Sequence, residues 1–260
     1  MSEKNEIAEA KPSELTLMLA STDVKGKIQE TLQTKTPGFI TSVLNTVDSN
    51  PALKKVAQFK PESIVRSALV AASLDLPIDK NLGFAWIIPY DGEAQFQIGA
   101  KGFIQLAQRT GQYLKMTMVD VYKNQFKSWN PLSETLDADF SILGEGEIIG
   151  FAFYFKLING FEKLAFSYKK DLLAHGEKYS KSFKNGPWQT NPNEMCKKTL
   201  AKQTIKQWGI MSTEMQTAIK ADQAVIKSDD IETGEAFSYV DNPNFKGETI
   251  DITNEGEKKQ

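Results

Sequence analysis

The sequence predicts an α+β protein with a central, mainly antiparallel sheet, helices packed on it, a helical N-terminal region and a flexible acidic C-terminal tail. Apolar residues recur at helical spacing through the first quarter, and the centre of the chain changes to the two-residue period of strands. The 260 residues are 40% hydrophobic and 25% charged. That composition is ordinary for a globular protein, and the length allows one large core with tails.

The first 75 residues are predicted to form a polar arm followed by helices. Residues 1–13 are charged and poor in large apolar side chains, which is typical of a disordered arm. Pro37-Gly38 is expected to separate two helices, and Pro61 suits the first position of a stronger one. No chemical motif occurs here, so we interpret the region as scaffold or as a contact between subunits. Helices are expected over residues 24–33 and 39–47, briefly from Asn50-Pro51, and over 62–75.

The centre of the chain is predicted to hold the sheet. Asp91-Gly92, between residues 84–90 and 93–98, is a strong hairpin pattern. Phe151, Phe153 and Phe155 alternate onto one face of a later strand, where packing under helices is favoured over a base-stacking platform. Further strands are expected over 115–123, 136–143, 148–157 and 161–167, a loop over 124–131, and helices from about 100 to Gly111 and over 169–175, 194–208 and 212–228.

Two helices carry candidate nucleic-acid-binding faces. On the first, cations and amides share a side without any carboxylate, and the glycines at its start leave N–H groups able to accept a phosphate. On the second, lysines recur every four residues, with Asn193 expected as its N-cap and an exposed tryptophan in the preceding turn. A solvated face is the alternative for both. The candidates are Lys101, Gln105 and Arg109 on the first helix, and Trp188, Lys197, Lys198, Lys202 and Lys206 on or before the second.

Two loops add further candidates. Lys123, Lys127 and Trp129 interleave a base-stacking ring with backbone-binding cations. The alternative, which is slightly favoured, is a tryptophan that anchors its loop to the core. Lys181 and Lys184 lie in a lysine-rich loop before the second helix. Lys197 falls in the apolar arc of that helix, so its ammonium group is expected to snorkel or to meet an anion.

The charge is unevenly distributed. The net charge is −2, yet residues 163–206 hold ten lysines against three acidic residues, and residues 222–260 hold ten acidic residues against four lysines. A basic middle with an acidic appendage indicates a phosphate-binding core and a separate tail at 229–260. A structural or phage-assembly protein would explain the composition but not this asymmetry.

Several function classes are disfavoured by what the sequence lacks. One cysteine and one histidine allow no disulfide and no cysteine-rich zinc site, and the phosphate-binding loop G-x-x-x-x-G-K-[ST] is absent. We therefore expect no enzyme activity, no cofactor and no metal. Without a long apolar run or a secretory signal, a cytoplasmic protein is expected. The alternative is a metal-dependent DNA nuclease, which would draw its carboxylates from Asp120, Asp137, Asp139, Glu145 and Glu147.

Two blocks of the sequence resemble the RecT family of phage single-strand annealing proteins. Residues 186–199 contain GPW and then EMxKKT, and residues 82–112 contain PY, IG-x-KG and LA-x-R-[ST]-G in the same order as the family. The two blocks and the chain between them cover about half of the sequence. A histidine that the family often carries between GPW and EM is replaced here by residues 189–192, so no role for it can be transferred.

The resemblance implies ATP-independent binding of single-stranded DNA and annealing of complementary strands in phage recombination. It also implies a homo-oligomer that forms rings or filaments on DNA in the cytoplasm of a bacterial host. Residues 14–228 would form the DNA-binding and annealing core, with subunit contacts in its N-terminal helices. The tail would bind a phage exonuclease or the host single-strand-binding protein.

Overall fold

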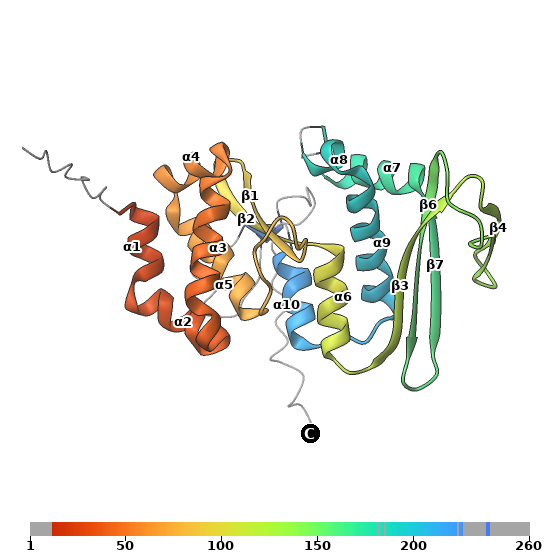
Figure 1. Ribbon diagram of the computed structural model, residues 1–260, viewed down its shortest axis with the longest axis horizontal. Coiled ribbons are helices and arrows are strands. Elements are labelled where there is room, and N and C mark those ends of the chain that lie inside the picture. Colours follow the sequence, from red (N-terminus) through yellow and green to blue (C-terminus); the bar gives the residue numbers. More distant parts are fainter. Residues whose placement is uncertain (1–11, 181–182, 185, 223, 226–237, 240–260) are drawn as a thin grey trace, which may run out of the picture.

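The computed structural model describes residues 12–180, 183–184, 186–222, 224–225 and 238–239. Helices and antiparallel strand pairs make up these residues, which confirms the predicted fold class. The N-terminal helices lie at one end of the molecule and a three-stranded sheet at the other (Figure 1). Between them lie α6 (Ala100–Arg109), α10 (Thr213–Ala221) and α9 (Pro192–Trp208). Most of the arm at 1–13 and of the tail at 229–260 lies outside the described residues.

Six helical segments form the N-terminal region. Residues 14–20 fold as a short helix that the sequence analysis did not predict; the Ser13 side chain accepts a hydrogen bond from the Thr16 N–H at its start. Pro37 lies in the first turn of a helix, where proline is tolerated, so the break falls at residues 33–35 instead. The segments are α1 (Glu14–Ala20), α2 (Thr22–Leu32), η1 (Gln33–Lys35), α3 (Thr36–Asp48), α4 (Pro51–Phe59) and α5 (Pro61–Ser73).

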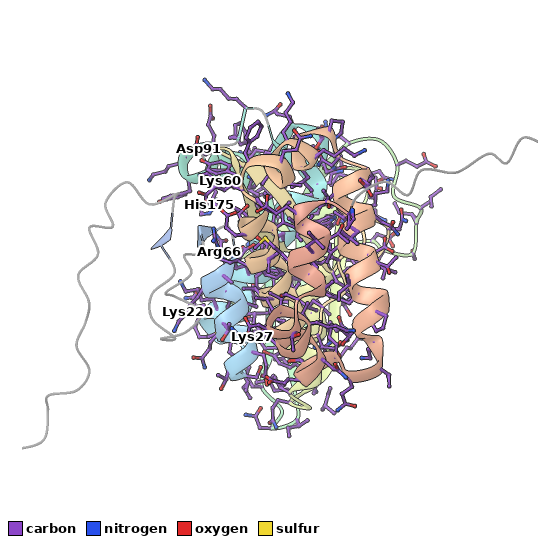
Figure 2. The ribbon with its side chains drawn as sticks, turned by 90° about the vertical axis from the view of Figure 1, so that its left-hand side faces the viewer. Lys27, Lys60, Arg66, Asp91, His175 and Lys220 are labelled. Atoms are coloured by element: carbon purple, nitrogen blue, oxygen red, sulfur yellow. The ribbon has the colours of Figure 1, made fainter. Side chains whose placement is uncertain are left out.

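Helix α5 is the centre of this region. Ile64, Ala68 and Ala71 on it are fully buried, and it contacts α1, α2, α4 and the hairpin of β1 (Ala85–Tyr90) and β2 (Glu93–Ile98). Asp91 and Gly92 both adopt positive φ between these strands, as the predicted tight turn requires. Figure 2 looks onto the N-terminal helices, with α10 and Lys220 to one side of them.

A three-stranded antiparallel sheet forms the other end. Its central strand β6 (Ile148–Leu157) pairs with β3 (Tyr113–Tyr122) and β7 (Glu162–Tyr168). Phe151, Phe153 and Phe155 are fully buried, and β6 contacts α7 (Lys169–Tyr179) and α9 (Pro192–Trp208). The prediction that these rings pack under helices is confirmed.

A second hairpin covers the opposite face of the sheet. The loop predicted over 124–131 is wrong, because β4 (Phe126–Asn130) pairs there with β5 (Thr135–Ala138). Phe126 stacks on Phe166 with ring centroids 5.5 Å apart, and Trp129 lies 5.7 Å from the same ring. These aromatic contacts, which join segments far apart in the sequence, stabilise the hairpin.

The remaining helices connect the two ends of the molecule. Helix α9 begins at Pro192 with Asn191 at its N-cap position, so the prediction of Asn193 as the cap is wrong. No described helix is long and apolar enough to cross a membrane. The other elements are α6 (Ala100–Arg109), α8 (Pro187–Thr190), α10 (Thr213–Ala221), β8 (Ala224–Val225) and β9 (Ser238–Tyr239).

Candidate nucleic-acid interface

A cavity of about 440 Å³ lies where the β1–β2 hairpin, the start of α6 and the start of α9 meet. Three lysines line it: Lys80, Lys101 and Lys198. Trp86, Ile88 and Met195 give it an apolar part. Amide groups and one carboxylate, that of Glu194, also line it, and Glu194 is paired with Lys197. The cavity therefore offers both cations for phosphates and an aromatic surface for bases.

Two glycines of the I-G-x-K-G segment allow a close approach of α6 to the hairpin beside this cavity. A Cβ atom on Gly99 would lie 2.4 Å from the Gly83 carbonyl oxygen and 2.6 Å from the Trp86 ring. A Cβ atom on Gly102 would lie 2.3 Å from the Phe84 carbonyl oxygen. Only glycine fits at these positions, so α6 begins directly against the hairpin, with Gly99 at its N-cap position beside the Trp86 ring.

A second cavity of about 240 Å³ adjoins the first along α9. Met195 and Lys198 line both cavities, and Lys202, Lys206, His175 and Tyr179 line the second. We call the two hollows together the α9 trough. Its principal residues are Lys80, Trp86, Lys101, Lys198, Lys202 and Lys206.

The lysine stripe of α9 is mostly turned toward a buried acid. The side chain of Asp222 is 1% exposed and lies 2.8 Å from the ammonium groups of both Lys198 and Lys202. The Ile98 N–H also donates to Asp222 Oδ1 at 3.2 Å. Burial opposes ionisation of this carboxyl, but the two lysine charges outweigh it and hold the pKa of Asp222 below its usual range.

This arrangement corrects the interpretation of the stripe as a solvated face. Lys198 is buried, Lys202 is half-buried, and Lys206 is exposed. Replacing Lys198 and Lys202 together by alanine would leave Asp222 as an unpaired buried charge. Loss of DNA binding in that variant would then report on folding as well as on contact.

Lys197 meets protein carboxylates. Its ammonium group lies 2.9 Å from Asp120 Oδ1 on β3 and 3.2 Å from Glu194 Oε1. Burial lowers the pKa of Lys197, and the two carboxylates more than offset it, so the pKa is raised. Lys197 therefore ties α9 to the sheet, and it does not line the trough.

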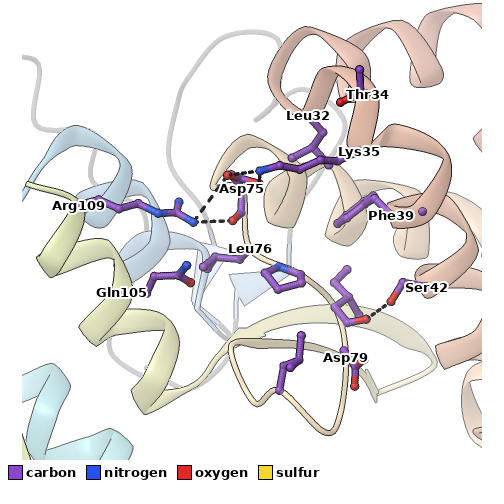
Figure 3. A pocket seen from close by; sticks show the side chains of 14 residues that line it. Leu32, Thr34, Lys35, Phe39, Ser42, Asp75, Leu76, Asp79, Gln105 and Arg109 are labelled. Carbon is purple, nitrogen blue, oxygen red and sulfur yellow. Dashed lines mark hydrogen bonds and ion pairs between the residues drawn. The ribbon is translucent and has the colours of Figure 1, made fainter.

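The polar face of α6 is divided between two sites. Lys101 lines the trough, whereas Gln105 and Arg109 line a separate cavity of about 540 Å³ beside the N-terminal helices (Figure 3). The Arg109 guanidinium donates to the carbonyl oxygens of Leu74 and Asp75, at 2.6 and 2.7 Å. Arg109 thus satisfies carbonyl groups at the C-terminal end of α5.

The predicted exposure of Trp188 is wrong. The side chain is 5% exposed, lies 5.8 Å from the Phe183 ring, and packs against Gly176, where a Cβ atom would approach the indole to 2.7 Å. Trp188 anchors α8 to α7 because burying so large an apolar ring is strongly favourable.

The other candidates lie away from the trough or outside the described residues. Lys127 pairs with Asp137 at 3.5 Å, and Lys123 is exposed beside the same hairpin. Trp129 lines a cavity of about 300 Å³ with Lys163 and Trp208. Lys184 is exposed, and Lys181 lies outside the described residues.

The five acidic residues considered for a nuclease centre are dispersed. Asp120 pairs with Lys197, Asp137 with Lys127, and Asp139 accepts hydrogen bonds from Ser141. Within the described part of the chain, no three His, Cys, Asp or Glu side chains are grouped so that they could hold a metal ion.

Sequence reasoning missed Lys80 and Trp86, which the fold brings beside Lys101 and Lys198. The glycines at 99 and 102 were the available sign, since glycines at a strand–helix junction often mark a close approach of backbones. The spacing of residues along the chain does not predict that residues 80–101 and 187–206 lie side by side.

The fold and the trough define the class of protein: a mixed helix–sheet protein with a cationic groove that suits a polyanion. A family model described as the RecT family matches residues 37–236, and the chain belongs to the RecT family. It is 40% identical over 243 residues to "Uncharacterized protein YqaK" of Bacillus subtilis (strain 168). That alignment covers 94% of this chain and 76% of YqaK. The resemblance in the two sequence blocks is thereby confirmed.

Proposed function

We propose that the protein binds single-stranded DNA in the α9 trough and anneals complementary strands without ATP. One observation carries the proposal: both sequence blocks that resemble the RecT family converge on this trough, which contains five lysines and Trp86. The family membership supports a role in DNA recombination and annealing.

The chemistry of the trough suits annealing. Annealing makes no covalent bond; it needs strands held by their phosphates while their bases test Watson–Crick partners. Lysine neutralises phosphate without reading sequence, and an aromatic ring stacks on any base. Lys80, Lys101, Lys202 and Lys206 supply the charge along the trough, and Trp86 supplies a ring at one end.

Roles for the other candidates follow from their contacts. Arg109, Lys197 and Trp188 hold the surrounding helices in place, and Gln105 belongs to the cavity beside Arg109. Lys184, which is exposed, and Lys181, which lies outside the described residues, stay candidates for further phosphate contacts. Lys123, Lys127 and Trp129 form a separate candidate contact on the β4–β5 hairpin, suited to the second strand or to the annealed duplex.

The family also supports a wider setting. We infer that the protein acts as a homo-oligomer, as a ring or filament in the cytoplasm of a bacterial host, with subunit contacts through the N-terminal helices. The acidic tail at 229–260 would bind a phage exonuclease or the host single-strand-binding protein. Electron microscopy after successive addition of two complementary oligonucleotides would detect the assembly, and a monomer throughout would contradict it.

The test of the DNA site uses the double variant Lys101→Ala/Lys206→Ala. Both lysines are exposed and line the trough, so the fold should survive their loss. Affinity for a labelled oligonucleotide should fall, and the log–log salt slope should flatten by about 1.4 units, since each phosphate contact on a single strand contributes roughly 0.7.

The matched control is Lys25→Ala/Lys55→Ala, which removes two exposed lysines from α2 and α4. Its salt slope should equal that of the unaltered protein. An unchanged slope in Lys101→Ala/Lys206→Ala, with folding verified by circular dichroism, would remove the trough as the DNA site.

A further inference from the structure

Asp222 occupies an unusual electrostatic position in the α9 trough. It follows the last residue of α10, is fully buried, and accepts hydrogen bonds from Lys198, Lys202 and the Ile98 N–H. Lys198 lines both cavities of the trough, and Asp222 itself lines the second one. The acid therefore lies beneath the surface on which a phosphate would rest.

A contribution to stability alone does not account for this cluster. A buried ion pair is seldom more stabilising than apolar side chains of the same volume, because removing both charges from water is costly. Two lysines four residues apart on a helix also repel each other. A single carboxylate between them offsets this repulsion and holds both ammonium groups 2.8 Å from its oxygens, beneath the trough.

We propose that Asp222 is a positioning residue for single-stranded DNA: it orients Lys198 and Lys202 beneath the trough and lowers their combined charge from two to one. The inference rests on the proposed function. As a consequence, the trough binds the phosphate backbone with moderate affinity. Moderate binding lets a bound strand slide and exchange while it searches for the register of its complement. A higher positive charge at the base of the trough would instead retain the strand.

The test begins with Asp222→Asn, which keeps the size of the side chain and removes its charge. Affinity for a labelled oligonucleotide should rise several-fold at low salt. The log–log salt slope should steepen by about 0.7. Annealing at saturating protein should slow, because each strand leaves its phosphate contacts less often.

The matched control is Asp120→Asn, which removes the partner of Lys197, a lysine that does not line the trough. It should leave the salt slope unchanged. A folded Asp222→Asn protein with the slope and affinity of the unaltered protein would overturn the proposal, because a purely structural ion pair would change stability and not the slope.

A second pair of variants decides the matter if Asp222→Asn does not fold. Lys198→Met leaves the cluster with a net charge of zero, and Lys198→Met/Asp222→Asn returns it to one. The double variant should bind DNA more tightly than the single variant, with a slope steeper by about 0.7. Equal affinities would overturn the proposal. The Lys101→Ala/Lys206→Ala variant leaves the cluster of Asp222, Lys198 and Lys202 intact. Its DNA affinity therefore tests the DNA site independently of Asp222.

Discussion

At the scale of residues, three lysines of α9 pair with acids on other elements: Lys198 and Lys202 with Asp222 after α10, and Lys197 with Asp120 on β3. The spacing of Lys198, Lys202 and Lys206 places them on one helical face. Asp222, the counterion that Lys198 and Lys202 share, lies 24 residues beyond Lys198 and directly follows α10. Similarly, Lys197 was expected to snorkel or meet an anion, and the anion is Asp120 on β3. Such partners depend on tertiary contacts that no local pattern specifies.

Arg109 gives a prediction at this scale. Its guanidinium satisfies two carbonyl oxygens at the end of α5, so Arg109→Ala should destabilise the protein by about 1–2 kcal/mol in urea denaturation. Affinity of the folded variant for single-stranded DNA should remain unchanged. Gln108→Ala, an exposed neighbour on the same helix, should change neither property. Reduced DNA affinity at unchanged stability would instead place Arg109 in the DNA site.

At the scale of elements, segments defined by local rules were predicted well. Asp91-Gly92 predicted the β1–β2 hairpin, the alternating phenylalanines predicted β6, and Pro61 predicted the start of α5. Strand β4 was missed because its burial depends on Phe166, a residue 40 positions further along the chain than Phe126. Helix α1 was missed because a helix of seven residues shows little periodicity.

The C-terminal tail gives a prediction for an element. A variant that ends after Ser228 should keep single-strand affinity equal or slightly higher at low salt, because the segment removed is acidic and repels phosphate. Annealing of purified strands should persist while recombination in cells falls through loss of a protein partner. A variant that ends after Val240 retains the pairing of β9 with β8 and serves as the control. Loss of annealing in both variants would show that the tail belongs to the annealing core.

At the scale of the whole molecule, the trough lies where segments distant in sequence meet. Residues 80–101 come from the hairpin and the start of α6, and residues 175–206 come from α7 to α9. The charge asymmetry of the sequence indicated a basic middle, and the resemblance identified the two blocks. The fold was needed to show that both blocks form one surface, because their convergence depends on how α6 and α9 pack together.

The central claim is that this surface anneals DNA by holding phosphates, without nucleotide hydrolysis or metal chemistry. The most direct measurement follows two complementary labelled oligonucleotides in excess chelator without ATP, with the unaltered protein, Lys101→Ala/Lys206→Ala and Lys25→Ala/Lys55→Ala. We expect rapid annealing by the first and third proteins, slow annealing by the second, and full-length strands throughout. Equal annealing by all three proteins, or shortening of the strands when metal is restored, would contradict it.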